Sequence, residues 1–252
     1  MQGIYILLLT LVFIFGCVIG SFLNVCILRI PNHEDITTTR SHCTSCGNDI
    51  KWYDLVPVVS FICLKGKCRH CQSKISVQYP IIELLNGCLY CTITVIMGLT
   101  ITTILTCLLA SCLIVIAVVD WRTFEIPVGL NVFIGILGLV NLVIDYKNWL
   151  LYLIGAVLVS GFLLILFVVS KGRAIGGGDI KLMAAAGLLL GWKNILVAFV
   201  IGCVLASVIH IIRMKISKKD HMLAFGPYLS VGILISQVFG SELIKMYMSL
   251  YS

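Results

Sequence analysis

Residues 81–119 read IIELLNGCLYCTITVIMGLTITTILTCLLASCLIVIAVV, an apolar stretch of 39 residues. As a single helix this stretch would be about 58 Å long at 1.5 Å per residue, whereas the hydrocarbon core of a bilayer is about 30 Å thick. The stretch must therefore fold back on itself, and Gly98-Leu99-Thr100 offers a turn near its middle. The stretch therefore forms two consecutive membrane-crossing helices, and the sequence predicts an all-α polytopic membrane protein.

The composition of the whole chain supports this fold class. Of the 252 residues, 60% are hydrophobic and 12% are charged, about half the charged fraction of a soluble domain, which excludes a soluble enzyme. The first apolar segment is too long for a signal peptide and lacks a basic start, so we interpret it as a span. Apolar windows of suitable length predict about eight transmembrane helices, near 3–28, 81–98, 101–119, 126–144, 149–170, 180–192, 194–212 and 223–244. The short segment 180–192 is rich in Ala and Gly, which indicates a helix packed within protein or a re-entrant segment.

Basic residues indicate the orientation of these spans. An even number of spans places both termini on the same side of the membrane. If the loop 29–80 is cytoplasmic, 15 of the 18 Lys and Arg residues lie on the cytoplasmic side, and only Lys147, Lys193 and Lys245 lie outside. Cytoplasmic loops of membrane proteins carry such an excess of Lys and Arg. We therefore predict that both termini are outside and that the loop 29–80 is cytoplasmic.

The loop 29–80 carries two Cys-x-x-Cys pairs, Cys43 with Cys46 and Cys68 with Cys71, separated by 21 residues. Four thiolates at this spacing can complete a tetrahedral zinc site, and cytosolic thiols remain reduced rather than forming disulfides. Because the protein would supply all four ligands, we expect the zinc to be structural. It would provide folding energy to a small zinc-knuckle domain that has little core. The alternative is a set of four unliganded cysteines.

Ionisable residues within or at the ends of spans are costly and are candidates for function. Asp120 follows one apolar segment, and Asp179 follows three glycines and opens another. Glycine lets the backbone approach other groups closely, so we expect Gly176 and Gly178 to support a site at Asp179. Asp179 alone could be a helix N-cap. The predicted topology, however, places both aspartates at cytoplasmic helix ends, which favours a pair.

Two facing aspartates can share one proton, because like charges a few ångströms apart do not both ionise easily. The ionised partner then takes a proton from a water molecule that attacks a peptide carbonyl, and the protonated partner donates to the carbonyl oxygen. We therefore predict Asp120 and Asp179 as a catalytic dyad that needs no metal. Glu83 is a further candidate and shares a helical face with Asn86 and Tyr90. It either supports the site or forms hydrogen bonds between helices.

Six motifs occur in order along most of the chain. They are residues 20–25 (GSFLNV), the four cysteines, residues 78–84 (QYPIIEL), Asp120 with Ile126-Pro127, residues 176–181 (GGGDIK) and residues 225–228 (FGPY). In this order they resemble the type IV prepilin peptidase (prepilin leader peptidase/N-methyltransferase) family of GxGD-type membrane aspartic proteases. Val128 departs from the Asp or Asn that many members carry after the proline. We expect activity to survive this difference because the dyad is intact.

The resemblance implies an aspartic endopeptidase of the bacterial cell (inner or plasma) membrane. It would remove the short basic leader of type IV prepilins or pseudopilins on the cytoplasmic side, with Asp120 and Asp179 as catalytic residues. It would also N-methylate the new N-terminus with S-adenosylmethionine, an activity linked in the family to the cysteine loop. The implied organisation is a first transmembrane helix (1–28), the cysteine loop (29–80) and a membrane-embedded peptidase domain (81–252). The expected partners are the substrate and membrane lipids, without nucleic acid.

Two other functions fit part of the sequence. A proton-coupled transporter also uses intramembrane carboxylates and broken helices, but it predicts internal repeats and carboxylates near the midplane. A general GxGD intramembrane protease would share the dyad and lack the methyltransferase activity. The sequence does not distinguish a pilus, a competence or a secretion substrate.

Overall fold

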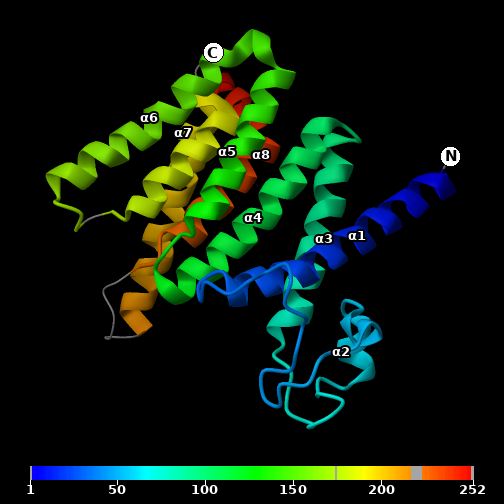
Figure 1. Ribbon diagram of the computed structural model, residues 1–252. Helices are drawn as coiled ribbons and strands as arrows, with labels where there is room; N and C mark the ends of the chain where they lie inside the picture. Colours follow the sequence, from blue (N-terminus) through cyan, green and yellow to red (C-terminus); the bar gives the residue numbers. More distant parts are fainter. Residues whose placement is uncertain (1, 174, 217–222, 251–252) are drawn as a thin grey trace. The chain divides into compact units, whose positions relative to one another are not determined.

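The computed structural model describes residues 2–173, 175–216 and 223–250, and this described part is helical, with isolated β-bridges instead of strands. The chain divides into two compact units, Met1–Thr103 and Ile104–Ser252. The elements are α1 (Gln2–Arg29), η1 (Trp52–Leu55), α2 (Val59–Cys63), α3 (Gln78–Met97), α4 (Ile101–Thr123), α5 (Val128–Ile144), η2 (Tyr146–Asn148), α6 (Trp149–Val169), α7 (Gly177–Ile216) and α8 (Gly226–Ser249) (Figure 1).

The long apolar run is broken where the sequence predicts a turn. Gly98 ends α3 with a φ of 72°, a left-handed conformation that glycine adopts without strain. Thr100 begins the next helix, because its Oγ1 accepts a hydrogen bond from the Thr103 N–H at 3.2 Å. Such a cap satisfies one of the free N–H groups at the start of α4. The prediction of two helices in this stretch is therefore confirmed.

In the first unit, α1 and α3 pack so closely that their contact requires glycine. A Cβ atom on Gly20 would lie 2.7 Å from the Cα of Glu83. One turn earlier, the side chain of Asn86 donates a hydrogen bond to the Gly16 carbonyl at 2.7 Å. Small residues and interhelical hydrogen bonds hold helices together in lipid, where no hydrophobic force acts between them. The packing of this pair thus follows from residues within its own two helices.

In the second unit, the first half of α7 runs parallel to α5. A Cβ atom on Gly178 would lie 3.0 Å from Ile126, just before α5 begins. Farther along both helices, a Cβ atom on Gly138 would lie 3.1 Å from Leu188. The start of α7 therefore lies at the same end of the unit as the start of α5.

Gly191 interrupts α7 and reverses its direction. Its φ of 76° and ψ of 168° are not helical, and glycine tolerates them. After this break, a Cβ atom on Gly240 would lie 2.7 Å from Asn194, and a Cβ atom on Gly202 would lie 3.1 Å from Leu229. The second half of α7 therefore runs antiparallel to α8. The two segments predicted at 180–192 and 194–212 correspond to these two halves.

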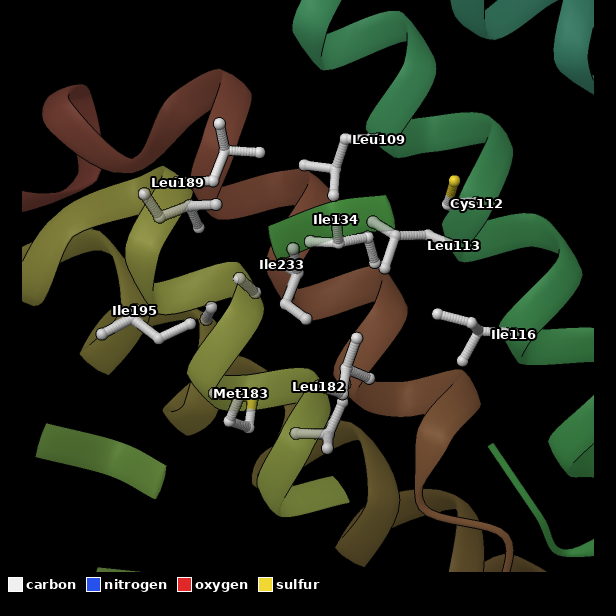
Figure 2. Packing of buried hydrophobic residues seen from close by; sticks show 14 of the residues in the cluster. Leu109, Cys112, Leu113, Ile116, Ile134, Leu182, Met183, Leu189, Ile195 and Ile233 are labelled. Carbon is white, nitrogen blue, oxygen red and sulfur yellow. The ribbon is translucent and has the colours of Figure 1, made fainter. Parts of the chain in front are cut away.

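The core of the second unit fixes the helix ends that carry the two aspartates. Leu109, Ile134, Leu182, Ile195 and Ile233 are fully buried in one apolar cluster and come from α4, α5, both halves of α7, and α8 (Figure 2). Close packing of such side chains fixes both the depth and the rotation of each helix. The positions of the polar residues at the helix ends therefore follow from the packing of this core.

The prediction of a multi-pass membrane protein is confirmed, whereas the count of eight spans is not. Six described helices are long and apolar enough to cross a membrane, and α5 is apolar but shorter. Several helix boundaries also differ from the prediction, by up to about five residues, and two of them lie at the candidate site. Helix α4 continues past Asp120 to Thr123, because the Asp120 carboxylate has a hydrogen-bond partner inside the protein. Helix α8 begins at Gly226 rather than at residue 223, where Pro227 suits a first helical turn.

Candidate functional site

Asp120 and Asp179 line one cavity of about 250 Å³ in the second unit. The cavity is open to solvent, and its walls carry both polar and apolar groups. Its lining residues are Asp120, Phe124, Glu125, Ile126, Gly176, Gly177, Gly178, Asp179 and Lys181. The structure therefore brings together the two predicted catalytic aspartates and the two glycines predicted to support them.

Asp120 lies in the last turn of α4 and is buried. Its Oδ2 accepts a hydrogen bond from the backbone N–H of Gly226 at 2.8 Å. Gly226 is the first residue of α8, so the carboxylate also faces the positive end of a helix dipole. A Cβ atom on Gly226 would lie 2.7 Å from this oxygen. Glycine at this position is therefore what allows the N-terminus of α8 to reach Asp120.

Asp179 lies in the first turn of α7 and is buried. The helix begins two residues earlier, at Gly177, so Asp179 is not the N-cap that the sequence allowed. A Cβ atom on Gly176 would lie 3.3 Å from the Asp179 carboxylate, and one on Gly178 would lie 3.0 Å from Ile126. The two glycines thus let the backbone close around Asp179 and pack against the segment that follows α4.

Phe124 turns the chain between the two aspartate-bearing segments. It adopts a left-handed φ of 56°, which is unusual for a bulky residue. Its N–H donates to the Asp120 carbonyl at 2.9 Å and ends α4. The chain can then bring Ile126 and Pro127 against the start of α7. Asp120 and Asp179 both line the resulting cavity, and a dyad that shares a proton requires two carboxyl groups within one such site.

Several residues of this site were not predicted as site residues. Gly226 was noted only as part of the 225–228 motif, and its contact with Asp120 joins residues that are 106 positions apart. Glu125 and Lys181 place one carboxylate and one ammonium group at the wall of the cavity. Their signal in the sequence is their place in or beside the motifs, because Lys181 ends the 176–181 motif and Glu125 immediately precedes Ile126-Pro127.

Gly226→Ala is expected to lower catalytic activity about 100-fold and to leave the protein folded. The added methyl group displaces the Asp120 carboxylate, and a displacement of about 1 Å of a reacting group can cost this factor. Gly129→Ala is the matched control, because a Cβ atom there meets nothing within 4 Å. Peptide cleavage rates and thermal unfolding of both variants test the prediction. Equal activity of the two variants would contradict it.

Glu83 lies in the first unit, where its carboxylate accepts a hydrogen bond from the Val58 N–H at 2.7 Å. Val58 precedes α2 and holds a left-handed φ of 61°, which is a strained conformation for a β-branched residue. Glu83 therefore ties the cysteine loop to α3. Asn86, on the same face, makes the interhelical hydrogen bond that the sequence allowed.

The two cysteine pairs lie in two similar tight turns. In the first turn, the Cys43 N–H donates to the Asn48 carbonyl, and Gly47 has a φ of 72°. In the second, the Cys68 N–H donates to the Ser73 carbonyl, and Gln72 has a φ of 59°. One isolated β-bridge closes each turn. Both turns therefore present their sulfur atoms in the same way, as two zinc knuckles would.

The sulfur atoms of Cys43, Cys46, Cys68 and Cys71 lie within 4.8 Å of one another. The Cys43 and Cys71 sulfurs are 3.8 Å apart. A tetrahedral zinc ion with Zn–S bonds of about 2.3 Å separates its sulfur ligands by about 3.8 Å. The residues present therefore fit a four-thiolate metal site.

Charge within the cysteine cluster also suits a cation. Backbone N–H groups of Ser45 and Cys46 lower the pKa of Cys43 to about 6. The backbone hydrogen bond from Asn48 favours the Cys46 thiolate, but burial and the sulfur atoms of Cys43 and Cys71 outweigh it and raise the pKa of Cys46 to about 11. A thiolate at one sulfur therefore makes it harder to ionise its neighbours, and a bound divalent cation would offset this repulsion.

Two family descriptions match the chain in succession. The bacterial peptidase A24 N-terminal domain matches residues 14–97, and the type IV leader peptidase family matches residues 107–211. The chain is 30% identical to a prepilin leader peptidase/N-methyltransferase of Bacillus subtilis (strain 168) over 247 residues, which cover 96% of this chain and 99% of that protein. Proteins of the same name are 29% identical in Aeromonas salmonicida (98% of this chain, 96% of that protein) and 32% identical in Vibrio cholerae (82% and 86%). No solved structure matches the chain.

Proposed function

The chain belongs to the type IV leader peptidase family, and we propose that it removes the short basic leader of type IV prepilins or pseudopilins with Asp120 and Asp179 as its catalytic dyad. The observation that carries this proposal is the burial of both aspartates at the wall of one cavity. Gly176 and Gly178 support the dyad by letting the backbone close around Asp179. The relatives that match most of the chain are named for this reaction.

The dyad performs the hydrolysis by general acid–base catalysis. The ionised aspartate takes a proton from a water molecule as its oxygen attacks the scissile carbonyl carbon, and the protonated aspartate donates its proton to the carbonyl oxygen. The tetrahedral intermediate then collapses, the C–N bond breaks, and the leaving amine takes a proton from the dyad. The Gly226 N–H holds Asp120 in position throughout.

The distribution of basic residues supports a proposed orientation in the membrane. Because 15 of 18 Lys and Arg residues lie on one side when eight spans are assigned, we propose that both termini are outside. The cysteine loop and the catalytic cavity are then cytoplasmic, where a basic leader is held. Glu125, at the cavity wall, offers a carboxylate that could receive a basic side chain of the leader.

The second proposed activity is N-methylation of the new N-terminus with S-adenosylmethionine, for which the relatives are also named. We assign a structural zinc ion to Cys43, Cys46, Cys68 and Cys71, whose sulfur atoms have the required spacing. Glu83 joins this loop to α3 through Val58, so it supports the loop directly.

Incubating the purified full-length protein with a type IV prepilin and isotopically labelled S-adenosylmethionine tests both activities. We expect mass spectrometry to show a shortened prepilin whose new N-terminus carries the label. Cleavage without the label would identify a GxGD protease that lacks the methyltransferase activity. An uncleaved prepilin would overturn the proposal.

The rival transporter hypothesis predicts carboxylates near the midplane of the membrane. Asp120 instead lies in the last turn of α4, and Asp179 lies in the first turn of α7.

A further inference from the structure

Residues 52–62 of the cysteine loop, here called the apolar segment, expose large apolar side chains. Trp52 is 80% exposed and Ile62 is 67% exposed, and neither η1 nor α2 contains a buried residue. Residues 55–64 carry no charged side chain. A group of exposed apolar side chains of this kind marks a surface that contacts a partner or a membrane. The exposed large side chains of the segment are Trp52, Tyr53, Leu55, Val56, Val59 and Ile62.

One hydrogen bond holds the apolar segment against a membrane-spanning helix. The Val58 N–H donates to the Glu83 carboxylate at 2.7 Å. Glu83 lies five residues into the candidate span α3, which is about 7–8 Å along the helix from its start. On α1 the neighbour of Glu83 is Gly20, nine residues before that candidate span ends at Arg29. The start of α2 therefore lies below the ends of both spans.

The backbone of the apolar segment satisfies its hydrogen bonds within the protein. The Ser60 N–H and hydroxyl both donate to the Val56 carbonyl, at 3.1 and 2.7 Å. The Ile62 N–H donates to the Val58 carbonyl at 3.1 Å. Val58 precedes the short helix, and the Glu83 carboxylate accepts its N–H in place of water. Polar backbone groups at membrane depth need such internal partners, because water is scarce there.

Basic side chains flank the apolar segment in the sequence. Lys51 precedes it, Lys65 and Lys67 follow it, and all three residues are exposed. Asp54 is the acidic residue within the segment, and it forms an ion pair with Arg69 at 2.6 Å. Lysine side chains beside an apolar surface attract anionic lipid headgroups. Tryptophan and tyrosine are enriched at the same depth, where the apolar and aqueous regions meet.

A lipid surface complements the apolar segment in depth, hydrophobicity and charge. Amphipathic interfacial segments bury their apolar side chains about 5–10 Å into the boundary between headgroups and acyl chains. This range includes the distance of about 7–8 Å that separates Glu83, and hence Val58, from the start of α3. We propose that the apolar segment inserts into the interfacial layer of a bilayer with anionic lipids and docks the cysteine loop on the membrane. Such docking is independent of the reaction proposed above.

Photo-cross-linking of the full-length protein, in nanodiscs of phosphatidylethanolamine and phosphatidylglycerol, tests this contact. We expect Ile62→p-benzoylphenylalanine to form lipid adducts detectable by mass spectrometry, as the same substitution does at Val95, which is exposed on the candidate span α3. Asn48, which is exposed in the first cysteine turn, is the matched control and should give about tenfold less lipid adduct.

Three outcomes of this experiment would overturn the proposal. The first is a lack of lipid adduct at Ile62 beside a positive result at Val95. The second is equal lipid labelling at Ile62 and Asn48. The third is an adduct at Ile62 with a second copy of the chain, or with an added prepilin, in place of lipid.

Hydrogen exchange of the wild-type protein in two kinds of nanodisc tests the role of charge. We expect the amides of α2 to exchange about tenfold more slowly with phosphatidylglycerol than in pure phosphatidylcholine. Combining Lys51→Gln with Lys67→Gln should remove most of this difference, and so should high salt, which screens the same attraction without any substitution. The Cys43 and Cys68 amides, bonded within the cysteine turns, should be unchanged and report that the loop stays folded. Equal exchange of α2 in both lipids would overturn the anionic preference.

Discussion

Asp179→Asn in the full-length protein is expected to lower prepilin cleavage by about 10³-fold or more while the protein remains folded. Positioned general acids and bases contribute about 10²–10⁴-fold to rate, and this change removes the proton that the dyad shares. Asparagine keeps the size of the side chain, so packing around Gly176 is retained. Initial cleavage rates and thermal unfolding in detergent provide the measurement.

Asp120→Asn is expected to have the same effect, and the double variant should be no worse than either single one. Two residues that act as one unit give losses that do not add. Asp145→Asn is the matched control. Asp145 lies outside the cavity and binds the side chains of Asn148 and Tyr152. Substantial cleavage by Asp179→Asn, or additive losses in the double variant, would show that the dyad is assigned wrongly.

The helices of this protein could be predicted because lipid imposes a simple rule on them. Apolar length alone located α1, α3, α4 and α6 to within a few residues. The turn at Gly98 was predicted from a glycine and from the limited length of a span. The division of α7 into two segments was predicted from span length, whereas Gly191 itself was placed inside the span 180–192. The number of crossings is harder to predict, because the first half of α7 is short and its packing, rather than its hydropathy, determines its path.

The contacts of the candidate site could be predicted only in part. Asp179, Gly176 and Gly178 could be predicted to form one site, because residues that are close in the chain are also close in space. The contact between Gly226 and Asp120 could not be predicted from sequence spacing, because it depends on how α8 lies relative to α4. Asn131 and Asn141 show the same limit. Both lie on the buried face of α5. Only the tertiary structure reveals that the Asn141 side chain has a hydrogen-bond partner, whereas that of Asn131 has none among the described residues.

Cys68→Ser is expected to reduce bound zinc from about one ion per chain to nearly none and to unfold the loop around residues 43–71. Structural zinc contributes an apparent 10–16 kcal/mol in small zinc domains. This loop has no apolar core in its two short helices, because neither η1 nor α2 contains a buried residue. Elemental analysis of the purified protein and hydrogen exchange across the loop provide the measurements. Cys63→Ser is the matched control, since Cys63 is an exposed cysteine of the same loop outside the cluster.

Leader cleavage should survive the loss of zinc, whereas methylation should not. The contacts that hold the dyad, from Gly226 to Asp120 and from Gly178 to Ile126, lie entirely within the second unit. None of them uses a residue of the cysteine loop, so unfolding that loop removes no contact of the dyad. If Cys68→Ser retained its zinc, the four-cysteine site would be wrong. If chelation stopped cleavage while the second unit stayed folded, the hydrolysis would depend on a metal, and the general acid–base mechanism of Asp120 and Asp179 would need to be replaced.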